Sequence, residues 1–72
     1  MKFYLRPWAE KIRDDLRRHM NRERLTVVDI AWRLRCSAQR VEKVLFDHIG
    51  DVVLDDLVRV AKSFGINAVI PA

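Results

Sequence analysis

The sequence is poor in the residues that build disulfide-rich, metal-clustered or turn-rich proteins, because its 72 residues include one cysteine, two glycines and two prolines. A single cysteine forms neither an internal disulfide nor a zinc cluster. No apolar run approaches the ~20 residues that span a bilayer, and residues 1–20 interleave charges with apolar side chains, unlike a signal peptide. These absences exclude a disulfide scaffold and a membrane-spanning helix. We expect a soluble, cytoplasmic protein in which Cys36 is a small buried hydrophobe.

The residues that are present suit one small folded domain over residues 1–72. Half of them are apolar and a third are charged, which is typical of a globular chain and unlike a disordered one. Folding has to offset roughly 1.5 kcal/mol of conformational entropy per residue, and so short a core barely does so. We therefore expect a compact helical domain, a dimer, or both. No catalytic motif is found, so no enzyme, metal site or cofactor is predicted.

Charge is unevenly distributed around the net value of +4. Residues 1–43 carry twelve basic and six acidic side chains, whereas residues 44–72 carry two basic and four acidic ones. A basic part next to a mildly acidic part predicts a molecule with one anion-facing side. The alternative is a solvated surface with an accidental bias.

Apolar spacing and helix-end signals predict four helices, at residues 8–20, 26–35, 37–46 and 54–64. Thr26 and Asp29 form a capping-box pattern, Ser37 is a good N-cap residue, and Gly65 is a natural helix stop. Short strands are predicted at the two ends. One is residues 2–5, a short strand or an extended lead-in, because Pro7 disfavours helical backbone before it, and the other is the apolar segment 66–70.

Residues 26–45 have the spacing of a helix-turn-helix unit. Ala31 is small where two helices must cross closely, a tight turn follows, and Val41 and Val44 anchor the second helix. That second helix must bury one side and leave its other side free for a DNA groove. The sequence therefore predicts a helix-turn-helix over residues 26–45.

Residues 25–66 resemble the Cro/repressor-type (XRE-like) helix-turn-helix DNA-binding domains. The landmarks that carry this resemblance are Leu25-Thr26, Ile30-Ala31, Arg33-Leu34, Ser37, Val41 and the run from Leu54 to Gly65. The resemblance implies a mainly α, lambda-repressor-like four-helix fold in which the third helix reads DNA. Two positions depart from the pattern: Arg35 replaces the usual turn glycine, and Val27 replaces a glutamine that often contacts phosphate.

The resemblance also implies a division of the polar side chains between bases and phosphates. Glutamine pairs with adenine and arginine or lysine with guanine, and alanine can contact a thymine methyl group. The predicted base contacts are Ala38, Gln39, Arg40 and Lys43. The predicted phosphate contacts are Thr26, Arg33, Arg35 and Ser37. For each basic residue, a solvated surface charge is the alternative.

The function implied is a transcriptional regulator, a repressor that binds a palindromic operator as a homodimer. The predicted dimer interface is Phe64, Ile66, Val69 and Ile70, with packing of this tail onto residues 2–5 as the alternative. A second interpretation is an antitoxin or a small viral or host-directed protein-binding module on the same scaffold. The apolar residues Val27, Val28 and Trp32 favour it, although Trp32 can instead pack on the first helix.

Overall fold

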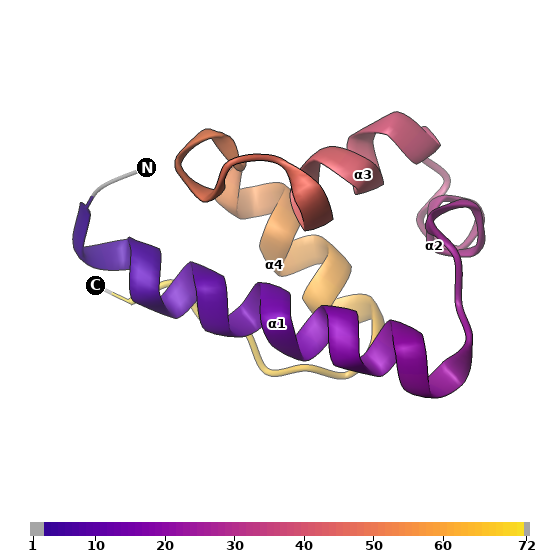
Figure 1. Ribbon diagram of the computed structural model, residues 1–72, viewed down its shortest axis with the longest axis horizontal. Coiled ribbons are helices and arrows are strands. Elements are labelled where there is room, and N and C mark those ends of the chain that lie inside the picture. The colour runs from indigo at the N-terminus through magenta and orange to yellow at the C-terminus, as the bar shows by residue number, and fades with distance from the viewer. Residues whose placement is uncertain (1–2, 72) are drawn as a thin grey trace.

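The structure is a computed structural model that describes residues 3–71, and these residues form four α-helices and two single-turn 3₁₀ helices (Figure 1). The expected mainly helical fold is confirmed, and each predicted helix is present. In chain order the elements are η1 (Phe3–Leu5), α1 (Arg6–Glu23), α2 (Val27–Leu34), α3 (Ala38–Phe46), η2 (Ile49–Asp51) and α4 (Leu54–Ser63). No helix within residues 3–71 is long and apolar enough to cross a membrane.

Helix α1 is longer at both ends than the apolar stripe predicts. It begins at Arg6 with Pro7 in its first turn, where the missing N–H of proline is not needed. The predicted strand 2–5 is therefore wrong for residues 3–5, which form η1 and lead directly into α1. Lys2 lies outside the described residues. The buried face of α1 is the predicted stripe, made of Ala9, Ile12, Leu16 and Met20.

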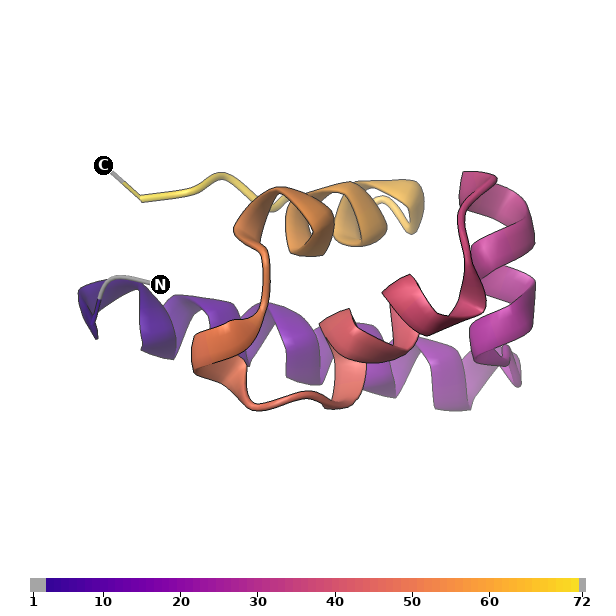
Figure 2. The same cartoon turned by 90° about the horizontal axis from the view of Figure 1, so that it is seen from above.

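The predicted C-terminal strand is also wrong, because residues 66–71 are extended without strand pairing. This tail runs back toward the N-terminal end of α1, so both chain ends lie at the same end of the molecule (Figures 1 and 2). Ala68 is buried, Ile66 is half-buried, and Val69 between Ala68 and Ile70 is exposed. The tail thus lies with one edge on the core, and the core side chains take the place of a partner strand.

A single core joins the four helices. Helix α1 packs against α3 and α4, and α2 crosses the end of this layer steeply, as both views show (Figures 1 and 2). Ala31 of α2 is buried in the core, and α2 packs against α3. The largest fully buried side chains are Leu16, Ile30, Leu45, Leu57 and Val41.

Three helices end in the same way, with a left-handed residue that lets two backbone N–H groups turn back to the last helical carbonyls. At the end of α2, Arg35 has φ 55° and ψ 46°, and the N–H of Cys36 donates to the carbonyl of Ala31 at 3.0 Å. Arg24 ends α1 with φ 54°, and Gly65 ends α4 with φ 76°. This arrangement is a Schellman motif. Only Gly65 adopts the left-handed conformation without a side-chain penalty.

We expect Arg35→Gly to raise the free energy of unfolding by about 0.5–1 kcal/mol, because glycine relieves the left-handed strain but loses more backbone entropy on folding. Urea unfolding followed by circular dichroism measures this change. Gly65→Ala, with open space around the added Cβ, is the matched reverse test and should lower stability. Destabilisation by Arg35→Gly would contradict the strain at this turn.

Candidate nucleic-acid interface

Helix α3 has one buried side and one exposed side. Val41, Val44 and Leu45 are 0–2% exposed and fix the helix to the core. Gln39 and Lys43 are exposed, and their i, i+4 spacing places them on one face, away from the three buried residues. Helix α3 therefore presents a narrow polar face that includes an amide and an ammonium group.

The N-termini of α2 and α3 are closed by their own side chains. Thr26 Oγ1 accepts a hydrogen bond from the Asp29 N–H at 3.2 Å, and Asp29 Oδ2 accepts one from the Thr26 N–H at 2.8 Å. The Asp29 carboxylate accepts hydrogen bonds from the Thr26 N–H and, at 3.0 Å, from the Thr26 hydroxyl, and these two bonds hold the pKa of Asp29 below its ordinary value. Ser37 Oγ accepts from the Arg40 N–H at 3.2 Å. The capping box and the Ser37 cap predicted from the sequence are confirmed.

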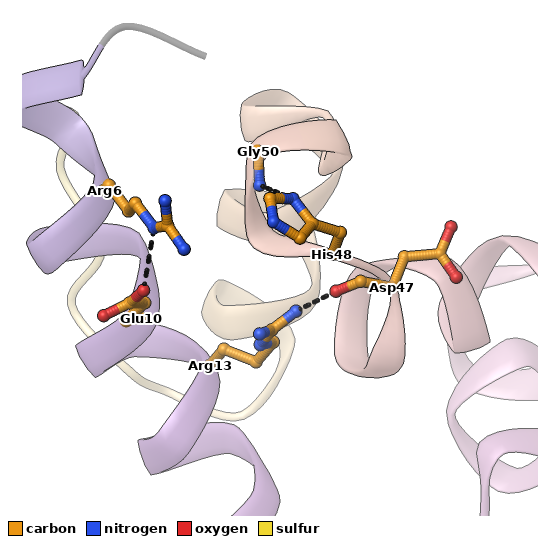
Figure 3. Close-up of polar contacts among 6 residues, drawn as sticks. All are labelled: Arg6, Glu10, Arg13, Asp47, His48 and Gly50. Atoms are coloured by element: carbon orange, nitrogen blue, oxygen red, sulfur yellow. Dashed lines mark hydrogen bonds and ion pairs between the residues drawn. The ribbon is translucent and has the colours of Figure 1, made fainter.

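The C-termini of α2 and α3 are held by arginines from the two longest helices. Arg17 of α1 donates twice to the carbonyl of Leu45, with the Nε contact at 2.9 Å. Arg13 of α1 donates to the carbonyl of Asp47, just past the end of α3 (Figure 3). Arg59 of α4 donates to the carbonyl of Leu34, the last residue of α2, at 3.1 Å. These cations satisfy carbonyls that a helix end leaves unpaired and lie at its negative pole.

The arginines at the helix C-termini were not predicted as contacts of α2 and α3. Partial burial lowers the pKa of Arg13, but an arginine keeps its charge in proteins. No local signal identifies these contacts, because they join residues 25 to 34 positions apart.

The structure places the four predicted base contacts in different surroundings. Gln39 and Lys43 are exposed on the outer face of α3. Arg40 points toward α4, because its Nε lies 3.4 Å from Asp56 Oδ2. Ala38 is half-buried and lines a groove shared with α2. Gln39, Arg40 and Lys43 line one open hollow of the surface, and of these three Gln39 and Lys43 make no ion pair within residues 3–71.

The four predicted phosphate contacts have different surroundings. The hydroxyl groups of Thr26 and Ser37 are engaged in the helix caps. The Arg33 guanidinium lies over the Phe64 ring, 5.0 Å from its centroid. Arg35 is exposed at the turn between α2 and α3 and makes no ion pair with any residue in the described range 3–71.

The predicted dimer residues also divide into two kinds. Phe64 and Ile66 are half-buried and pack against the core of their own chain. The centroids of the Phe64 and His19 rings are 4.9 Å apart. Val69 is 68% exposed and Ile70 is 38% exposed. Only the last part of the tail therefore offers apolar surface to a second chain.

The basic excess lies on α1 and at the two arginines that flank α2, Arg24 and Arg35, rather than around α3. Residues 6–35 carry nine basic and five acidic side chains, whereas residues 38–56 carry two basic and five acidic ones. The acidic group includes Glu42 on α3 and Asp55 and Asp56 in the first turn of α4. A polyanion that approaches α3 is therefore attracted from the α2 side and repelled from the α4 side.

The remaining titratable residues supply no further site. His48 Nδ1 accepts a hydrogen bond from the Gly50 N–H at 3.1 Å, and Arg6 pairs with Glu10 along α1 (Figure 3). Over the part of the chain that the structure describes, no group of three His, Cys, Asp or Glu side chains is placed to hold a metal ion.

Comparisons with protein-family models, with curated proteins and with solved structures find no match to this chain.

Proposed function

We propose that this protein is a sequence-specific DNA-binding regulator in which residues 26–45 act as a helix-turn-helix of the Cro/repressor type. The observation that carries the proposal is the construction of α3. Its back is buried, its N-terminus is capped, its C-terminal carbonyl is held by Arg17, and Gln39 and Lys43 are exposed on one face. A rigid helix with one open polar face is what major-groove readout requires.

In this proposal Gln39 and Lys43 contact base edges, and the duplex backbone follows the α2 side. Arg35 and Arg24 lie on that side and make no ion pair within residues 3–71, so both are free to contact phosphate. The carboxylates of Glu42, Asp55 and Asp56 discourage phosphates on the other side. The acidic side thus restricts the orientation of the helix in the groove as much as the cations do.

One recognition helix reads too few base pairs for useful selectivity, so the regulator is proposed to act as a homodimer on a palindrome. Val69 and Ile70 are the exposed part of the predicted dimer surface. Both residues lie in the C-terminal tail, remote in sequence from α3. Occupation of an operator by such a dimer would exclude polymerase, which makes repression the proposed outcome.

Affinity selection from a pool of random duplexes, followed by titration at two salt concentrations, tests the proposal. Arg24 and Arg35 are free to contact phosphate, so we expect log K to fall with log salt with a slope of about −2 per protomer. Gln39→Ala should cost about 1–3 kcal/mol at one base position, and Arg35→Ala should weaken binding to all sequences alike.

The matched control is Lys62→Ala, which removes an exposed cation at the far end of α4 and should leave DNA binding unchanged. Failure to enrich any duplex at low salt would overturn the proposed function. Equal losses on every sequence for Gln39→Ala and Arg35→Ala would contradict the division between base and phosphate contacts.

A further inference from the structure

The exposed face of α2 carries a large apolar patch. Trp32 is 81% exposed, and Val28, one turn earlier, is 56% exposed. Trp32 does not pack on α1, so this alternative from the sequence is wrong. Trp32 alone leaves about 120–200 Å² of surface in water. Tryptophan with this exposure is typical of the anchors of protein interfaces.

A groove lies directly beside the Trp32 indole. Its small residues are Ala31, Cys36 and Ala38, and Val28, Trp32 and Arg35 complete its lining. The groove has a volume of ≈ 580 Å³, which is room for at least one large side chain. A protruding aromatic beside an open groove of small residues can hold an apolar side chain on two sides.

Charge and spacing indicate what fits this surface. Arg35 is the only charged residue in the lining, and it makes no ion pair within residues 3–71. Val28 and Trp32 follow the i, i+4 pattern along one face of α2, and Arg35 comes directly after the last residue of this helix. That face complements a helix that carries apolar residues on one stripe and a carboxylate at its end.

We propose that the Val28–Trp32–Arg35 surface binds an acidic amphipathic helix of a partner protein. A second copy of this chain fits less well. A two-fold contact places the same patch against itself, so it brings the positive C-terminal part of α2 close to its own copy.

The same surface overlaps the proposed DNA site. Arg35 and Ala38 line the groove and also belong to the predicted phosphate and base contacts. A carboxylate on Arg35 takes the place of a phosphate, so the partner and the duplex exclude each other. This competition depends on the proposed function, whereas the docking surface itself does not. The partner would thus act as a release switch for the regulator.

Selection of helical 16-residue peptides from a displayed random library, with the full chain as bait and no DNA present, tests the docking surface. We expect enriched peptides to combine acidic residues with apolar residues at i, i+4 spacing. Trp32→Ser should weaken their binding by about 30-fold or more, as for an interface anchor. Arg35→Gln should weaken it about two- to fivefold, as for a salt bridge at an interface rim.

The controls are Val53→Ser, which removes an exposed apolar side chain elsewhere, and Lys62→Gln, which removes a cation elsewhere. Both should bind the selected peptides like the original chain. No enrichment, peptides without acidic residues, or equal binding to Trp32→Ser would each overturn the proposal. Self-association in sedimentation that Trp32→Ser abolishes would also overturn it, in favour of a second copy.

Duplex DNA added to the peptide complex separates the two proposals. Displacement of the peptide by an enriched duplex supports the competition. Simultaneous binding of peptide and duplex overturns the competition but leaves both sites in place. A chain that binds the peptides through Trp32 and binds no duplex overturns the proposed function alone.

Discussion

Leu45→Ala is expected to lower the free energy of unfolding by about 2–5 kcal/mol, as for a leucine truncated in a packed core. Leu45 is fully buried at 0% exposure, and it is one of the three residues that fix α3 to the core. The truncation leaves a cavity that short helices with rigid neighbours cannot easily fill. For a small domain with a total stability of about 5–15 kcal/mol, this loss is large.

The next residue along the chain supplies the control. Phe46 is a larger side chain but is 57% exposed, and its ring lies 5.2 Å from the Arg17 guanidinium carbon. Phe46→Ala should therefore cost about 0.5–1 kcal/mol, the worth of an exposed cation–π contact. Urea unfolding of both variants, followed by circular dichroism, shows which substitution causes the larger loss in the free energy of unfolding. A greater loss for Phe46→Ala than for Leu45→Ala would mean that α3 is rotated from the orientation described.

Arg17→Ala is expected to lower the free energy of unfolding by about 1–3 kcal/mol, because it leaves the part-buried carbonyl of Leu45 without its donor. The substitution also removes the cation from the negative end of α3 and from the Phe46 ring. Amide hydrogen exchange should show the loss first in the last turn of α3. Arg17→Lys should recover part of the stability, because an ammonium group still carries charge and donors.

Arg18 is the matched control for Arg17. It has the same side chain one position along α1, but within residues 3–71 it pairs only with Asp15, and it is exposed. Arg18→Ala should change stability by less than about 0.5 kcal/mol, as is usual for an exposed ion pair on a helix. Equal effects of the two substitutions would show that the contact between Arg17 and Leu45 does not stabilise α3.

Much of the fold can be predicted from the sequence because its signals are local. The four-residue spacing from Ile12 to Met20 predicts the buried face of α1. The starts of α2 and α3 are predictable from Thr26, Asp29 and Ser37, because these residues form hydrogen bonds within one helical turn. Gly65 reports a helix stop because of its left-handed backbone. Arg35 ends α2 in the same conformation, which the family resemblance predicts at this position but residue type alone does not.

The remaining features depend on contacts between distant residues. Segment 66–70 has the composition of a strand, but composition does not show whether a segment pairs with another strand or packs on the core. Ala68 is buried in the core. From the sequence Arg40 is predicted to contact a base, but the fold places it in an ion pair with Asp56 of α4. In the sequence Arg17 has the position of a surface charge, but the fold places the Leu45 carbonyl of α3 within hydrogen-bond distance of it. Partners of long charged side chains are therefore the least predictable part of the candidate site.

The shortness of α2 and α3 links binding to cooperativity of folding. They have eight and nine residues, fewer than the ~12–15 that an isolated helix needs to persist in water. Neither helix has enough hydrogen bonds of its own to survive undocking from α1 and α4. The polar face of α3 and the Trp32 surface of α2 therefore exist only while the whole domain is intact, and they disappear together when it unfolds.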